Sequence, residues 1–209
     1  MQRNDATRTP FTMSRRGLLK AVSILALAGL AAPISSRIAP AHAAALKADG
    51  SKTLIVYYSR TGNTREMAGL IRQRTGGDIL ELHTVTPYPS DYKATTEQAK
   101  REQESGYLPP LQPIQTDVLS YDVIFVGSPS WWATLAPPVK TFLTSYDLSG
   151  KTLVPFVTHG GTGMGRNASD TRDLCPNATV LAGLALRGSN IDERGSDVDD
   201  WLRTIGLAR

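Results

Sequence analysis

Cysteine is almost absent from this chain of 209 residues, in which Cys175 is the only one. A lone cysteine cannot form an intramolecular disulfide. The two histidines beyond residue 43, His83 and His159, are far from Cys175 and from each other in sequence, so no metal-ligand spacing is present. We therefore expect Cys175, which precedes Pro176 at the end of a helix-like stretch, to be a buried structural thiol and not a nucleophile.

Several enzyme motifs are missing as well. The Gly-Lys-Thr triplet at residues 150–152 is not a nucleotide-binding P-loop, because it precedes a strand-like segment and has Ser145 where the motif needs its first glycine. The glycines of residues 160–165 follow the pattern Gly-Gly-x-Gly-x-Gly and not the Gly-x-Gly-x-x-Gly of a dinucleotide-binding turn. No Gly-x-Ser-x-Gly of a serine hydrolase occurs. These three classes are therefore excluded.

The positive charge of the chain is concentrated at its start. The net charge is +4 and the isoelectric point is near 9.3. Six of the 23 Lys and Arg residues, but only one of the 19 Asp and Glu residues, lie within residues 1–43. The other 166 residues hold 17 basic and 18 acidic side chains, which gives no reason to expect a nucleic-acid partner. Their number suits one domain with a full core.

The first 43 residues have the pattern of a twin-arginine export signal. Arg15 and Arg16 precede an apolar run at residues 21–32, and residues 41–43 form a small-x-small cleavage site. We predict a signal peptide over residues 1–43, a short linker over 44–51 and one domain over 52–209. The apolar run is short for a membrane-spanning helix, so we expect no membrane span after cleavage, although an uncleaved anchor is the alternative. The protein would then be periplasmic or secreted, in a bacterium.

The domain is organised around the stretch at residues 53–64. An apolar strand over residues 54–58 ends in six residues rich in hydroxyls, and the residues from Arg65 onward have the spacing of a helix face. The unpaired N–H groups and the positive dipole at the start of such a helix can bind a phosphate without a lysine. The alternative is an ordinary capped turn, since Ser, Thr and Asn are common N-caps.

This stretch resembles the phosphate loop of the flavodoxins, Thr/Ser-x-Thr-Gly-x-Thr, and the resemblance extends over about residues 52–205. In that family the loop holds the terminal phosphate of FMN. The resemblance therefore implies that FMN is the cofactor. It also implies that its phosphate is held by Ser59, Arg60, Thr61, Gly62, Asn63 and Thr64.

The order of apolar runs predicts an α/β fold. Five strands are expected at residues 54–58, 78–83, 121–127, 151–158 and 178–186. They alternate with helices expected from residue 65 and over residues 91–105, 138–146, 164–174 and 196–205. Such alternation indicates a doubly wound, five-stranded parallel sheet, for which the flavodoxin-like order 2-1-3-4-5 is the natural prediction. Ligands then bind beyond the carboxyl ends of the first, third and fourth strands.

The loop expected after the third strand, residues 127–134, contains two adjacent tryptophans. They cannot both point into the core, so we expect one to anchor the loop and the other to stack on a flat aromatic ligand. The segment resembles the Pro-x-Trp-Trp-Gly loop of flavodoxin-like proteins, which contacts the isoalloxazine. The resemblance assigns Pro129, Ser130, Trp131 and Trp132 to the cofactor site. Ala133 replaces the glycine of that loop and tolerates a positive φ less well.

The loop after the fourth strand supplies the third part of the predicted site. Its glycines let the backbone approach a planar ring and offer N–H donors to the pyrimidine oxygens. The Thr-His-Gly-Gly sequence at its start resembles the same flavodoxin-like branch, which assigns His159, Gly160 and Gly161 to the cofactor. His159 either bonds to the backbone of its own loop, or contacts the flavin or gives a proton to a substrate. No other residue is a catalytic candidate.

These observations predict an FMN-binding, flavodoxin-like electron-transfer protein that acts outside the cytoplasm. Its partner would be a redox protein or a small quinone-like acceptor. The alternative is an FMN-dependent NAD(P)H:quinone-type oxidoreductase. The near-neutral domain lacks the acidic surface common among soluble flavodoxins, which argues against the carrier. Nicotinamide cofactors are scarce outside the cytoplasm, which argues against the enzyme. A flavin-free domain that keeps only the scaffold is a third possibility.

Overall fold

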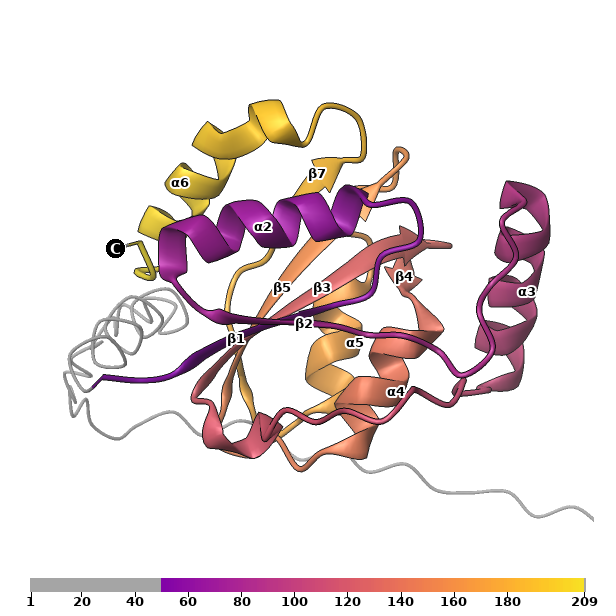
Figure 1. Cartoon of the computed structure of the whole chain (residues 1–209), viewed down its shortest axis with the longest axis horizontal. Helices are drawn as coiled ribbons and strands as arrows, with labels where there is room; N and C mark the ends of the chain where they lie inside the picture. The colour runs from indigo at the N-terminus through magenta and orange to yellow at the C-terminus, as the bar shows by residue number, and fades with distance from the viewer. Residues whose placement is uncertain (1–49, 209) are drawn as a thin grey trace, which may run out of the picture. The chain divides into compact units, whose positions relative to one another are not determined.

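The computed structural model of the protein describes residues 50–208 (Figure 1). The strands are β1 Thr53–Tyr57, β2 Asp78–Glu81, β3 Val123–Trp131, β4 Thr134–Leu135, β5 Thr152–His159, β6 Thr179–Val180 and β7 Leu184–Arg187. The helices are α2 Asn63–Thr75, α3 Tyr92–Ser105, α4 Pro137–Ser145, α5 Asn167–Leu174 and α6 Gly195–Thr204, with short 3-10 turns at Val118–Ser120 and Asp192–Arg194. None of the helices in this part of the chain is long and apolar enough to span a membrane. The predicted signal peptide and most of the linker lie outside the described residues.

The sheet has the predicted order. Its strands run β2-β1-β3-β5-β6, and every pairing along this path is parallel. The predicted positions of the second strand at one edge and of the third strand at the centre are therefore confirmed. β7 also pairs with β5 in parallel, and the only antiparallel pair in the sheet of the described residues joins β3 to the short β4. The carboxyl ends of β1, β3, β5 and β7 consequently meet at one rim.

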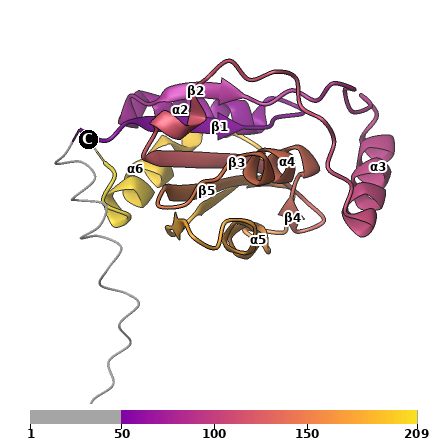
Figure 2. The same ribbon diagram turned by 90° about the horizontal axis from the view of Figure 1, so that it is seen from below.

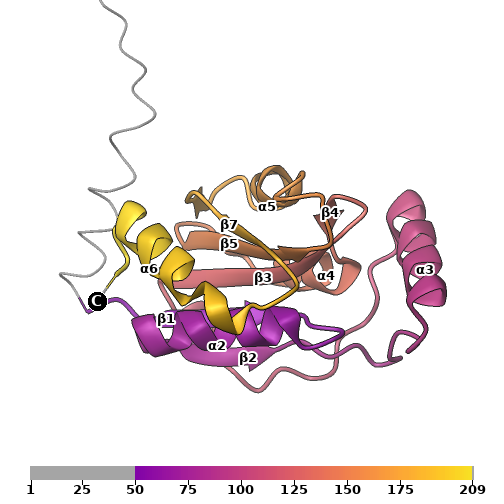
Figure 3. The same cartoon turned by 90° about the horizontal axis from the view of Figure 1, so that it is seen from above.

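Helices cover both faces of the sheet because alternate residues of each strand point to opposite sides. Ile55 and Tyr57 of β1 pack in one core with α2 and α6, whereas Leu54 and Val56 pack in a second core with α4. Figures 2 and 3 show α2 and α6 on one side of the sheet and α4 and α5 on the other. α3 stands at the side of these layers, beyond the rim where the strands end (Figure 1).

The fifth strand was expected to be continuous over residues 178–186, but it is split into β6 and β7. The interruption lies opposite Pro155 of β5. The Leu153 carbonyl accepts a hydrogen bond from the Leu181 N–H, so the backbone of Leu153 faces the fifth strand. Pro155, two residues further along β5, faces the same way, but a proline has no N–H to donate. Gly183 then approaches closely, because a Cβ at this position would lie 2.7 Å from the Pro155 carbonyl oxygen. The proline therefore breaks the ladder.

The expected loop over residues 127–134 is mostly regular structure. β3 continues to Trp131, turns over two residues and returns as β4, with Trp131 paired to Thr134. Trp132 and Ala133 form the turn with φ values of 56° and 61°, as a two-residue hairpin of type I′ requires. Propensity alone did not predict this turn, because such φ values normally favour Gly, Asn or Asp. The buried position predicted for Cys175 is confirmed.

Candidate functional site

A hollow of about 410 Å³ opens at the rim where β1, β3, β5 and β7 end. Ten of the residues predicted for the cofactor line it, namely Ser59, Arg60, Thr61, Asn63, Thr64, Pro129, Ser130, Trp131, His159 and Gly160. The structure thus brings together three loops that are about 30 to 70 residues apart in sequence, as the parallel topology predicts. Three predicted residues, Gly62, Trp132 and Gly161, do not line the hollow.

The loop before α2 is held in shape by its own groups. Gly62 is the residue before the helix and has a φ of 97°, which glycine adopts without strain. Its N–H donates to the Ser59 hydroxyl over 3.2 Å. The first turn of α2 therefore begins at the hollow, and N–H groups of this turn have no partner within the helix. The Thr64 hydroxyl, in contrast, is buried against Thr158 and is not directed at a ligand.

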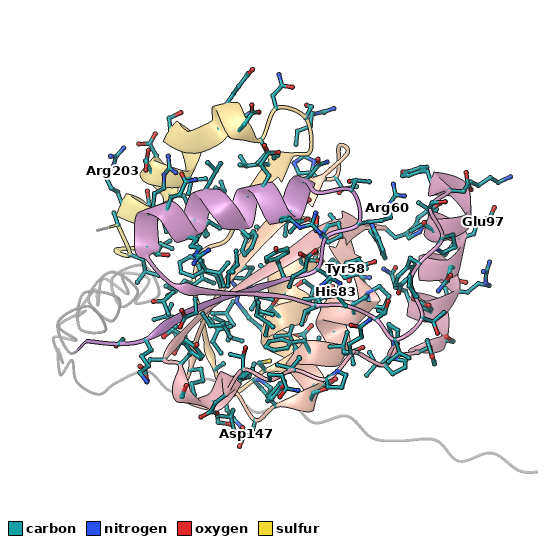
Figure 4. All side chains as sticks on the ribbon, viewed as in Figure 1. Tyr58, Arg60, His83, Glu97, Asp147 and Arg203 are labelled. Atoms are coloured by element: carbon teal, nitrogen blue, oxygen red, sulfur yellow. The ribbon has the colours of Figure 1, made fainter. Side chains whose placement is uncertain are left out.

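Arg60 connects this loop to α3. Its guanidinium donates to the Ser90 carbonyl over 3.1 Å and lies 5.7 Å from the centre of the Tyr92 ring. Figure 4 shows Arg60 between the start of α2 and α3. Tyr92 is 70% exposed and lines the hollow from the first turn of α3. The arginine thus holds an aromatic side chain at the outer edge of the hollow by a cation–π contact.

The two tryptophans have separate positions, but the expected division, with one in the core and the other at the site, is not found: Trp131 takes both roles and Trp132 neither. Trp131 is half-buried, lines the hollow and packs edge-on against Tyr58 and Tyr88, with ring centres 5.7 and 5.0 Å away. Trp132 is 54% exposed and turns toward α3, where its indole N–H donates to the Thr96 carbonyl over 2.9 Å. Trp131 is therefore the tryptophan that faces a ligand in the hollow.

His159 carries the one unsatisfied polar atom of the hollow among the described residues. Its Nδ1 is buried and has no hydrogen-bond partner in this part of the chain. The imidazole does not bond to the backbone of its own loop, so that alternative is wrong. Burial and the positive charge of Arg187 hold the pKa of His159 below its ordinary value, which keeps the ring neutral near pH 7. A buried ring nitrogen without a partner costs stability.

Five lining residues were not predicted from the sequence, namely Tyr92, Thr158, Arg187, Gly188 and Ser189. Arg187 ends β7 and the next two residues follow it, at the same rim as the ends of β1, β3 and β5. Arg187 pairs in register with His159, and the Gly188 N–H donates to the His159 carbonyl over 3.0 Å. A Cβ at Gly188 would lie 2.5 Å from the Asn63 amide nitrogen, so glycine allows this segment to close against the first loop.

The charge and shape of the hollow favour a flat, anionic ligand. Its described lining contains the cations Arg60 and Arg187 and no Asp or Glu. The first residues of α2, the Trp131 indole at the end of β3 and the His159 imidazole at the end of β5 line it. A phosphate can bind the N–H groups at the start of α2, and an aromatic heterocycle can pack against the indole and the imidazole. Among residues 50–208, no cluster of His, Cys, Asp or Glu could hold a metal ion.

Known proteins resemble the chain in both sequence and structure. The family profile described as flavodoxin matches residues 52–205. A candidate flavoprotein from Bacteroides eggerthii is 29% identical, with a TM-score of 0.66 over 74% of this chain and 98% of that one. A second candidate flavoprotein, from Bacteroides uniformis, is 27% identical, with a TM-score of 0.65 over 74% and 99% of the two chains.

A third solved structure contains a ligand. It is a flavoprotein from Lactobacillus acidophilus in complex with FMN, and it is 29% identical to this chain. The TM-score is 0.58, and the match covers 70% of this chain and 99% of that one. No match was found among the curated proteins.

Proposed function

The chain belongs to the flavodoxin family, and from this premise we propose that it is an FMN-binding electron-transfer protein that acts outside the cytoplasm. FMN is a phosphorylated, planar heterocycle, which is the ligand chemistry that the hollow favours. The flavoprotein of Lactobacillus acidophilus, which resembles this chain over 70% of its length, binds the same molecule. The observation that carries the proposal is that the loop after β1 and the carboxyl ends of β3 and β5 line one hollow, which contains two arginines and no acidic residue.

Different residues of the hollow bind different parts of the cofactor. The loop from Ser59 to Thr64 and the first turn of α2 bind the phosphate, and Arg187 adds a cation. Trp131 packs against the ring system, while Pro129, Ser130 and Gly160 shape its pocket. His159 is neutral and contacts the polar edge of the ring. The bound flavin supplies the electron transfer, whereas the protein orients it and excludes water from it.

The proposed location and partner rest on the sequence. Residues 1–43 have a twin-arginine pattern, so the protein would fold around its cofactor in the cytoplasm and then be exported to the periplasm or the medium. There it would exchange electrons with a redox protein or a small quinone-like acceptor. An exported reductase would have no steady supply of nicotinamide nucleotides. For this reason we prefer the carrier over an NAD(P)H-dependent reductase.

Two measurements on one preparation test the proposal. The purified protein, or the apoprotein after addition of FMN, should show the absorption of bound flavin. A protein that stays colourless with excess FMN contradicts the cofactor. Under anaerobic conditions, NADH or NADPH should leave the flavin absorption almost unchanged over minutes, whereas dithionite should bleach it. Rapid bleaching by either nucleotide instead indicates the NAD(P)H:quinone-type oxidoreductase.

A further inference from the structure

A second hollow, of about 210 Å³, lies beside the first. The two share Ser59 and Arg60, and the remaining walls of the second come from the segment after β2 and from Gln112. Tyr58 and Tyr88 form its aromatic wall, with ring centres 5.9 Å apart and planes tilted by 59°. Figure 4 shows Tyr58 and the exposed His83, which also lines this hollow, in the same region below Arg60. Of the residues that line it, only Ser59 and Arg60 also belong to the proposed FMN site.

Tyr58 provides a polar group without a partner in the second hollow. The side chain is 93% buried, since only 7% of it is exposed. Its hydroxyl makes no hydrogen bond to any residue in the described part of the chain, and it is not sealed from the open space that the residue lines. Burial raises the pKa of Tyr58 to about 12, so the phenol stays protonated and can donate. A buried hydroxyl in this state gains most from a ligand that accepts its hydrogen bond.

Arg60 gives the second hollow a positive charge. Within the described residues its guanidinium makes one hydrogen bond, to the Ser90 carbonyl. Most of its five N–H donors are therefore open to a ligand. The carboxylate nearest to the aromatic wall, Glu102, does not line the hollow. It is only 7% exposed and accepts hydrogen bonds from Tyr88 and Gln98. The hollow therefore offers a cation and donors without a competing acid in its lining.

From these contacts we infer that the second hollow binds a small planar aromatic acid. The ring lies against Tyr58 and Tyr88, and the acid group meets Arg60 and the Tyr58 hydroxyl. The space is sufficient, since a cavity of about 150 Å³ holds a benzene ring. Trp131 packs edge-on against both tyrosines and also lines the first hollow, so the two sites adjoin through this aromatic cluster and through Ser59 and Arg60. The inference goes beyond the proposed function and does not require FMN.

Benzoate is the probe for this site, and benzyl alcohol matches its shape without its charge. Binding is measured by calorimetry and ligand-observed NMR, with FMN added to fill the first hollow and again without it. We expect benzoate to bind with a dissociation constant of about 1 mM and benzyl alcohol about tenfold more weakly. Equal binding of both probes, or displacement of FMN by benzoate, would overturn the inference.

Three variants locate the probe. Gln112→Trp fills the second hollow and should abolish benzoate binding, whereas Gln115→Trp, at an exposed position outside both hollows, should leave it unchanged. Tyr58→Phe should weaken benzoate about threefold to tenfold without lowering the unfolding midpoint, because its hydroxyl has no hydrogen-bond partner to lose within residues 50–208. Wild-type affinity in Gln112→Trp or in Tyr58→Phe would show that benzoate binds elsewhere and would refute the site.

Discussion

The hydroxyls of Thr64 and Thr158 lie 2.8 Å apart in a buried hydrogen bond that spans 94 residues of sequence. Thr64 is in the first turn of α2, and Thr158 is next to His159 at the end of β5. Both side chains are almost fully buried. This contact fixes the loop proposed for the phosphate relative to the end of β5, which is proposed to hold the ring, so the geometry of the hollow depends on a hydrogen bond between two of its lining residues.

Replacement of Thr64 by Val should lower the free energy of unfolding of the apoprotein by about 1–3 kcal/mol, because the Thr158 hydroxyl is left buried without a partner. Urea unfolding measures the loss. The double variant Thr64→Val with Thr158→Val removes both hydroxyls and should recover most of it. If the double variant is as unstable as the sum of the two single ones, the hydrogen bond is not the cause.

The two tryptophans should differ in their effect on FMN. Trp131→Ala removes an indole that lines the hollow and packs against Tyr58 and Tyr88. We expect FMN to bind at least tenfold more weakly and the unfolding free energy to fall by about 2–3 kcal/mol. Trp132→Ala is the matched control, since this indole turns to α3. Its FMN affinity, followed by the quenching of flavin fluorescence, should stay within twofold of wild type; an equal loss in both variants contradicts the assignment.

Ala133→Gly should stabilise the protein. Ala133 has a φ of 61°, a conformation that costs an L-residue roughly 1 kcal/mol relative to glycine. The gain, of up to about 1 kcal/mol, is reduced by the greater freedom of glycine in the unfolded chain. Thermal unfolding compares this variant with Ala168→Gly, in which a residue of α5 is changed and stability should fall. A drop in both would mean that the turn is not strained at Ala133.

Stability should also depend on pH through His159. The pKa of His159 is lowered in the folded protein by burial and by Arg187, so below its ordinary value of 6.5 the unfolded chain binds the proton more readily. The histidine therefore stabilises the apoprotein fully above about pH 7, and this contribution is lost as the pH falls through 6.5. His159→Gln should flatten the dependence of the unfolding midpoint on pH between 7.5 and 5, and an unchanged dependence in this variant would contradict the assignment.

The sequence predicted the sheet and most of the hollow, because long apolar runs and the loops that follow them carry strong local signals. The order of the strands followed from their number and their alternation with helices. The Trp132–Ala133 turn was missed, since non-glycine residues there adopt positive φ against their propensity. Tyr92 was missed because it belongs to a polar helix whose position depends on tertiary contacts, such as that of Arg60.

Arg187 shows the same limit at the fifth strand. The strand was expected to end at residue 186, but β7 continues to Arg187, and its parallel pairing with β5 brings that residue to the rim beside His159. Nothing local marks an arginine there as part of the site. Arg187 is paired with His159 because β7 and β5 are parallel neighbours in the sheet. Only the folded structure shows this pairing. The residues that sequence reasoning missed are thus those placed by packing and not by a motif.

Arg187→Gln separates a contact with the phosphate from one with the ring. If Arg187 meets the phosphate, its loss should weaken FMN about tenfold, because a charge-assisted hydrogen bond to a dianion is replaced by a neutral one. Riboflavin, which has the same ring system but no phosphate, should bind wild type and variant within twofold of each other. Fluorescence titration of both ligands gives the comparison, with Arg172→Gln, an exposed change on α5 outside the hollow, as the control. An equal loss for both ligands would place Arg187 against the ring and contradict its contact with the phosphate.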